Sequence, residues 1–296
     1  MSSTLKAATV EDQDQTLQSV EAERIEAELS GRLLYGESLT RDELQTWYEQ
    51  LNSGFFDRAP DRDHLADEAD QHAYAYGAMN HFHAIGTLLR RRFTCCVALG
   101  CAAGDDVAPL APVVDRFLAI EPLEKWWRPE IGGKPARYVM PSIFGHIDLD
   151  TGAADLATSF GVLHLIPNVS QVVGEIARVL SPGGLFVVRE PISWMGDWRK
   201  PRPGLTANER GLPLHWFEEM IRQKGFRVVR RRLCMFRPLA IVAEKFGISR
   251  PYATMPITVI DWILSESLHW NVHYRRDGFV RKNAPASALW LLEKQP

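Results

Sequence analysis

The chain has 296 residues, a formal net charge of −3 and 46% hydrophobic residues. This length and composition suit a globular protein with one large domain, or with a core domain and a cap. The small net charge excludes a general attraction to nucleic acid or acidic membranes, and the arginine runs at 90–92 and 230–232 are short enough to be solvated edges. No stretch approaches the roughly 18 apolar residues that cross a membrane.

The four cysteines are Cys95, Cys96, Cys101 and Cys234, and no pair has the C-x-x-C spacing of a metal site. This usage is typical of reduced thiols. The first 15 residues contain no apolar segment of the kind found in a secretory signal. We therefore expect a cytoplasmic protein with no membrane partner and no nucleic-acid partner.

The N-terminal part of the chain has helical patterning. Leu17, Val20, Ile25 and Leu29 recur three to five residues apart, and residues 72–92 mix apolar and aromatic side chains at similar spacing. We expect residues 1–92 to form a helical cap.

From residue 93, short apolar runs alternate with helical patterns. Strands are expected at 95–99, 117–122, 138–142, 154–164, 185–191 and 226–234, and helices at 107–116, 169–180 and 215–225. Such alternation is typical of βαβ units and predicts an α/β fold with a doubly wound, mostly parallel sheet. Residues 93–235 would form this core, 236–285 a helical insertion that caps the substrate, and 286–296 the last core strand.

Three features of this core fall at the same edge of the predicted sheet. Gly100 and Gly104 lie in a loop, VALGCAAG, between the first strand and its expected helix. There the backbone can approach a ligand closely, and a helix N-terminus would offer free N–H groups. Glu121 ends the second strand, where a carboxylate can accept hydrogen bonds from two ribose hydroxyls. The stretch SFGVLHLIPN, residues 159–168, leaves the fourth strand.

This ordered set, together with EIARVLSPGGLFVVREP and WFEEMIRQKGFRVV, resembles the class I S-adenosylmethionine-dependent methyltransferases over about residues 93–235. The resemblance implies a seven-stranded sheet whose last strand is antiparallel, and S-adenosylmethionine as cofactor. It also implies how the cofactor is bound. The loop surrounds the methionine part, and Glu121 binds the ribose. The residues after the third strand contact the adenine, those after the fourth contact the methyl group, and the helical cap supplies a lid. These residues are Gly100, Cys101, Ala102, Gly104, Glu121, Pro122, Pro141, Ser142, Ile143, Phe160, Gly161, Tyr76 and Asn80.

The loop departs from the family pattern at two positions. Ala98 stands where an acidic residue is frequent, and Ala102 replaces the middle glycine, which is tolerable if its φ is negative. Because of these departures, a catalytically inactive, methyltransferase-like binding protein is an alternative interpretation. A dinucleotide-dependent reductase is the other alternative, but its third glycine would fall on Asp105, whose charge would repel a pyrophosphate.

Methyl transfer to a protonated oxygen or nitrogen benefits from a base. His164 and Glu190 end strands at the substrate edge and are the catalytic candidates. Aromatic and cationic side chains beyond the fifth strand suit a polar acceptor. The predicted acceptor-binding residues are Trp194, Trp198, Arg199 and His215.

We expect a small acceptor of natural-product or saccharide type, methylated on oxygen or nitrogen. Methylation of nucleic-acid bases is not expected, because SFGVLH stands where base-methylating relatives carry NPPY or DPPY. Asp148 and Asp150 alone are too few ligands for a metal, so we expect none. The sequence does not fix the oligomeric state and allows a homodimer.

Overall fold

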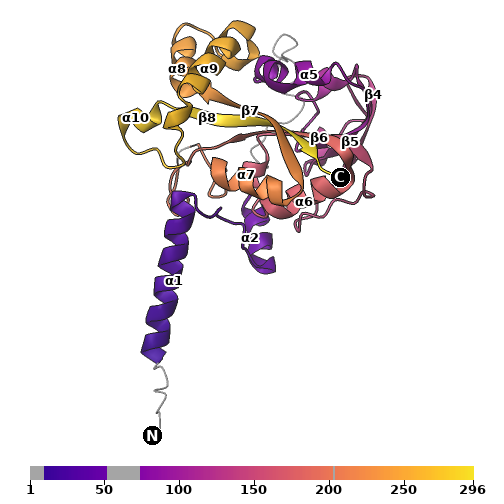
Figure 1. Ribbon diagram of the computed structural model, residues 1–296. Helices are drawn as coiled ribbons and strands as arrows, with labels where there is room; N and C mark the ends of the chain where they lie inside the picture. Colours follow the sequence, from indigo (N-terminus) through magenta and orange to yellow (C-terminus); the bar gives the residue numbers. More distant parts are fainter. Residues whose placement is uncertain (1–9, 52–73, 203) are drawn as a thin grey trace.

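The computed structural model describes residues 10–51, 74–202 and 204–296 (Figure 1). Its centre is a sheet in the order β3-β4-β2-β1-β5-β6-β8-β7. Strands β4, β2, β1, β5 and β6 pair in parallel, whereas β8 runs antiparallel to both β6 and β7. The strands are β1 Phe93–Leu99, β2 Val114–Ile120, β3 Glu130–Ile131, β4 Lys134–Val139, β5 Ala154–Phe160, β6 Leu180–Pro191, β7 Phe226–Phe236 and β8 Pro285–Lys294.

The predicted α/β class, with a mostly parallel sheet and an antiparallel last strand, is confirmed. The short strand β3, which pairs antiparallel with β4 at the sheet edge, is additional to the seven predicted. Burial on both faces explains why the parallel strands appear in the sequence as continuous apolar runs. In β1, Cys95 and Val97 belong to one buried cluster, whereas Cys96 and Ala98 belong to the other.

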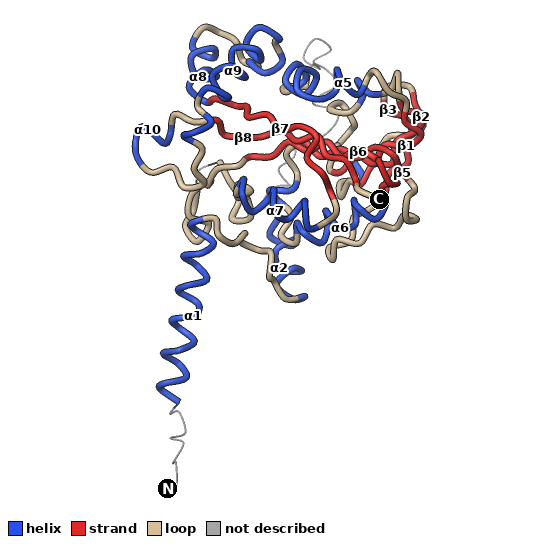
Figure 2. The backbone as a smooth tube through the Cα atoms, in the orientation of Figure 1, coloured by secondary structure: helices blue, strands red, loops and turns tan. Residues whose placement is uncertain are grey.

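Helices cover both faces of the sheet. In Figures 1 and 2, α6 and α7 pack below the sheet, whereas α5, α8 and α9 lie above it. The helix α1 extends away from the body of the molecule. The helices are α1 Val10–Ser30, α2 Arg41–Leu51, α4 Gly77–Asn80, the π-helix His81–Ile85, α5 Gly86–Leu88, α6 Val169–Val179, α7 Leu214–Gln223, α8 Arg237–Lys245, α9 Met255–Ser267 and α10 Gly278–Lys282. None of the helices in the described ranges is both long and apolar enough to cross a membrane.

The prediction of a helix over residues 107–116 is wrong. Only a 3₁₀ turn, Ala108–Leu110, follows the loop after β1, and β2 begins at Val114. Pro109 is acceptable at the start of a helical turn, but Pro112 lacks the N–H that would donate to the Ala108 carbonyl in a continuing helix. The loop is therefore not followed by the helix N-terminus that we expected to offer backbone donors.

Candidate functional site

A cavity of about 580 Å³ opens at the carboxyl ends of β1, β2, β4 and β5. We call it the strand-end cavity. Parallel strands place their carboxyl ends at one edge, which is where open α/β sheets bind ligands. It is lined by Tyr48, Leu51, Gly100, Ala102, Ile120, Glu121, Pro122, Leu123, Trp126, Met140, Pro141, Ser142, Ile143, Gly161, Val162, Leu165 and Ile166.

Most of the predicted cofactor residues are in this lining, but some are not. Cys101 and Phe160 are buried in the core cluster that faces helix α5. Gly104 is buried against β3, where a Cβ would lie 2.7 Å from Ile131 Cδ1. These three residues shape the loop and the strand end from behind the cavity wall.

The loop from Gly100 to Gly104 depends on left-handed backbone geometry. Gly100 has φ +60°, and a Cβ there would lie 2.6 Å from Val162 Cγ1. Ala102 has φ +47°, so the condition under which alanine would be unstrained is not met. A left-handed alanine costs roughly 1 kcal/mol relative to glycine. The loop thus carries local strain at the residue that faces the cavity.

Glu121 connects this loop to the strand-end cavity. Its Oε2 accepts a hydrogen bond from the Ala102 N–H at 3.0 Å, and its Oε1 accepts one from Leu123 N–H at 3.0 Å. The side chain is 5% exposed, and burial raises the pKa of its carboxyl group. Because each carboxylate oxygen has two lone pairs, both oxygens keep capacity for donors from a ligand in the cavity.

Gly161 lines the strand-end cavity at the end of β5, and His164 lies just behind it. Gly161, at φ +77°, donates its N–H to the Arg189 carbonyl at 2.7 Å. A Cβ at Gly161 would lie 3.9 Å from both His164 Cε1 and an Arg189 Nη2. A Cβ would thus make ordinary van der Waals contacts with both side chains, so the positive φ rather than lack of space favours glycine here.

His164 is held by Glu190. The imidazole Nδ1 lies 3.0 Å from Glu190 Oε2, and the glutamate also accepts the backbone N–H groups of Val162, Leu163 and His164. With Glu190 acting as acceptor, Nδ1 carries the proton in the neutral ring and Nε2 keeps the lone pair. No residue in the described part of the chain forms a hydrogen bond with Nε2.

Arg210 fixes the turn that carries His164. Its guanidinium is buried and donates to the carbonyl oxygens of Tyr35, His164 and Ile166 at 2.6, 2.8 and 2.6 Å. Burial lowers the pKa of Arg210 to about 10. Sequence reasoning did not single out this residue as a support, because nothing in the local pattern reveals that its acceptors lie on two distant segments.

Helix α2 covers one wall of the cavity, which the sequence did not predict. Tyr48 and Leu51 line it, and Trp47 Nε1 donates to the Leu165 carbonyl at 2.9 Å. This bond attaches the helix to the turn after β5. The helical pattern predicted α2, but this tertiary contact could not be read from it.

The predicted lid residues Tyr76 and Asn80 do not line the strand-end cavity. They surround Arg189 of β6 instead: Nε donates to Asn80 Oδ1 at 3.0 Å, Nη2 donates to Tyr74 Oη at 3.1 Å, and the guanidinium lies 4.3 Å from the centre of the Tyr76 ring. Arg189 is 5% exposed. This cluster attaches the segment before β1 to the end of β6.

The predicted acceptor-binding residues lie away from the strand-end cavity. Trp198 is buried and stacks on Tyr35 at 4.3 Å, and Arg199 is exposed and pairs with Asp197 at 2.8 Å. Trp194 contacts Arg275, and His215 is exposed on α7. The structure therefore does not bring these four side chains together around the cavity.

Among the residues that the structure describes, no group of three or more His, Cys, Asp or Glu side chains could hold a metal ion. The four cysteines are buried free thiols.

Comparisons with known proteins agree with this geometry. Residues 97–188 match the profile of the methyltransferase domain family. A solved S-adenosylmethionine-dependent methyltransferase from Thermotoga maritima is 15% identical, covering 84% of this chain and 100% of its own, with a TM-score of 0.50. A structure named as an S-adenosylmethionine-dependent methyltransferase from Listeria monocytogenes is 12% identical, covers 74% of this chain and 99% of its own, and has a TM-score of 0.49. One from Mesorhizobium loti is 15% identical, covers 75% of this chain and 100% of its own, and has a TM-score of 0.48. No curated protein matches the sequence significantly.

Proposed function

The chain carries a methyltransferase domain with the class I S-adenosylmethionine-dependent fold, and we propose that it methylates an oxygen or nitrogen atom of a small polar acceptor. S-adenosylmethionine is its methyl donor, and the bound donor would supply an electrophilic methyl group on a sulfonium. The observation that carries the proposal is the strand-end cavity, which runs from Glu121 past Gly100 to Gly161.

The lining residues fit the donor. A volume of about 580 Å³ is in the range of small-molecule sites. We propose that Glu121 accepts the ribose hydroxyls and that Pro122, Pro141, Ser142 and Ile143 lie along the adenine. Gly100, Ala102 and Gly161 would contact the part of the donor nearest the sulfonium, since only small residues let the backbone approach it. Cys101, Gly104 and Phe160 would support this wall.

His164 is our candidate for the general base. Its Nε2 lone pair would accept the proton that the acceptor oxygen or nitrogen loses when the new bond to carbon forms. Glu190 would orient the ring and stabilise the imidazolium by charge. Turnover would then depend on His164, whereas donor binding would not.

The positions of the basic residues support a small acceptor rather than a nucleic acid. Arg230 donates to the His83 carbonyl at 2.7 Å, and the Arg232 guanidinium lies over the rings of Phe82 and Trp262. These arginines of the 230–232 run are engaged within the protein rather than forming a phosphate-binding track. We place the protein in the cytoplasm because its thiols are free.

Calorimetry and a labelling assay together test the proposal. Titration with S-adenosylmethionine, its demethylated product and NADH should show binding of the first two only. Incubation with methyl-labelled donor and a small-molecule extract should then transfer the label. Donor binding without any transfer would favour the inactive binding protein, and binding of NADH alone would favour a reductase.

A further inference from the structure

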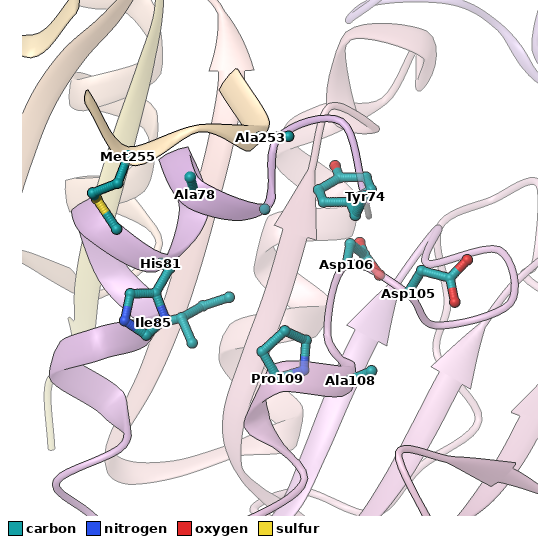
Figure 3. A pocket seen from close by; sticks show the side chains of 11 residues that line it. Tyr74, Ala78, His81, Ile85, Asp105, Asp106, Ala108, Pro109, Ala253 and Met255 are labelled. Atoms are coloured by element: carbon teal, nitrogen blue, oxygen red, sulfur yellow. The ribbon is translucent and has the colours of Figure 1, made fainter. Parts of the chain in front are cut away.

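A second cavity, of about 620 Å³, lies beside the turn that replaces the expected helix after β1. We call it the Asp106 cavity (Figure 3). The helical segment 77–85, the turn 105–109 and residues Ala253 and Met255 enclose it. Because the chain between β1 and β2 forms only a 3₁₀ turn, no helix fills the space against segment 77–85. Most of its lining is apolar: Ala78, Ile85, Ala108, Pro109, Ala253 and Met255.

Asp106 is the unusual member of this lining. Its side chain is 8% exposed, and its Oδ1 is buried without a hydrogen-bond partner in the described part of the chain. Burial raises the pKa of Asp106 to about 7. A buried carboxylate oxygen without a hydrogen-bond partner is costly, and such an oxygen calls for an explanation, for which a bound ligand is one candidate.

The neighbouring groups compensate this carboxylate only in part: the backbone N–H groups of Asp106 and Val107 stabilise its charge, yet its pKa remains raised. Arg189 attracts it from a distance, but the Nε and Nη2 groups of that guanidinium donate to Asn80 and Tyr74 instead. Tyr74 lies beside Asp106 in Figure 3, and Asp105 is exposed on the same turn. An anionic ligand would be repelled by the two aspartates, whereas a cation would complete the site.

We propose that Asp106 binds the alkylammonium group of a small molecule, whose carbon atoms pack on the apolar wall of the Asp106 cavity. An ammonium group can donate one of its three N–H groups to this carboxylate, and its positive charge balances the negative charge of the carboxylate. Two sources share this chemistry. One is the amino-acid end of the methyl donor, because Asp106 is two residues beyond Gly104 on the loop that borders the strand-end cavity. The other is an amine that serves as acceptor. Both rest on the proposed function.

The first experiment uses Asp106→Asn, which keeps the shape of the side chain and removes its charge. Asp115→Asn is the matched control, because Asp115 is an exposed aspartate that does not line the Asp106 cavity. Each protein is titrated by calorimetry with S-adenosylhomocysteine and with methylthioadenosine, which has the same nucleoside but no amino-acid end. If the donor's ammonium is the ligand, Asp106→Asn weakens S-adenosylhomocysteine binding about tenfold or more. Methylthioadenosine binding stays within about twofold, and Asp115→Asn changes neither affinity by more than that.

The second experiment tests the amine source with benzylamine and its neutral analogue benzyl alcohol. Binding is followed by chemical-shift changes in the protein. Wild type should prefer benzylamine by about tenfold or more, and Asp106→Asn should lose that preference. If Asp106→Asn does not fold, as judged by near-UV circular dichroism, Asp106→Ser replaces it in both experiments.

The two experiments separate failure of the inference from failure of the proposed function. Unchanged S-adenosylhomocysteine affinity in Asp106→Asn, together with no preference for benzylamine in wild type, overturns the ammonium site. If wild type binds neither nucleoside, the donor assignment has failed, and the benzylamine comparison alone then decides whether Asp106 binds a cation.

Discussion

Glu190 accepts a hydrogen bond from His164 Nδ1 at 3.0 Å, and the same carboxylate accepts the backbone N–H groups of Leu163 and His164 in the turn that carries the ring. The two residues come from different strands, since Glu190 lies in β6 and His164 follows β5. One carboxylate thus fixes both the tautomer of the ring and the position of its backbone. This arrangement directs the Nε2 lone pair away from the glutamate.

His164→Ala should reduce methyl transfer by about 100-fold or more, because the acceptor loses its base. Donor affinity should remain within about twofold of wild type, since the ring does not line the strand-end cavity. Labelled-methyl transfer and calorimetry measure the two quantities. His146→Ala is the matched control, because His146 also lies 3.0 Å from a glutamate, Glu175, but is mostly exposed. Full activity in His164→Ala would remove this residue from the mechanism.

Glu190→Gln should lower both turnover and stability. The amide nitrogen of glutamine would face backbone N–H groups that now meet a carboxylate oxygen, so at least one buried donor loses its acceptor. We expect a loss of about 1–3 kcal/mol in the free energy of unfolding, measured with urea. The turnover number should fall while the donor dissociation constant changes little. A variant with normal turnover would show that ring orientation is unimportant.

Glu121→Ala should weaken donor binding by about 1–3 kcal/mol through the loss of charged hydrogen bonds. Since Glu121 also accepts the N–H of Ala102, part of the effect could come from a displaced loop. Glu121→Gln serves as the control, because its amide oxygen can still accept one of the two backbone donors. If calorimetry gave wild-type affinity for both variants, the ribose assignment would be wrong.

Much of the fold could be predicted because the buried strands are short apolar runs with definite ends. The run from Cys95 to Leu99 forms most of β1, and 185–191 is the part of β6 that pairs with β5 and β8. The position of Glu121 at the end of β2 followed from the same reasoning. These predictions depend on local patterns that few tertiary contacts can alter.

The failures have tertiary or backbone causes. Apolar spacing alone favours a helix after β1, but with Pro112 in the segment only a 3₁₀ turn forms there. The Asp106 cavity lies beside this turn. The aromatic and cationic side chains beyond the fifth predicted strand favour a substrate surface by composition. In the structure, however, Trp198 packs on Tyr35, and Arg210 donates to distant carbonyl groups. Tyr76 and Asn80 contact Arg189, a partner that their spacing could not reveal.

Ala102→Gly should stabilise the protein. At φ +47° the alanine Cβ is strained, and glycine relieves this strain at some cost in unfolded-chain entropy. We expect a gain of about 0.5–1 kcal/mol in the free energy of unfolding, measured by urea denaturation. Ala103→Gly is the control, because Ala103 has no positive φ and should lose stability instead. Equal losses in both variants would mean that residue 102 is not left-handed in solution.

Asp106→Asn should change how stability depends on pH. Burial raises the pKa of this carboxyl group from 3.8 in the unfolded chain to about 7 in the folded protein, so the folded state holds the proton more tightly. Its contribution to stability is therefore complete below about pH 4 and is lost as the pH rises through about 7. Asparagine has no proton to lose. The stability of Asp106→Asn relative to wild type should thus increase by about 2–3 kcal/mol between pH 5 and pH 8.

Urea unfolding of the ligand-free proteins at both pH values measures this difference. Asp115→Asn is again the control, because Asp115 is exposed, does not line the Asp106 cavity and should leave the pH dependence of wild type unchanged. A constant difference between Asp106→Asn and wild type would mean that Asp106 is already charged and compensated at pH 5. Adding a saturating cationic ligand should reduce the difference, because the bound charge favours the ionised carboxylate that wild type alone possesses.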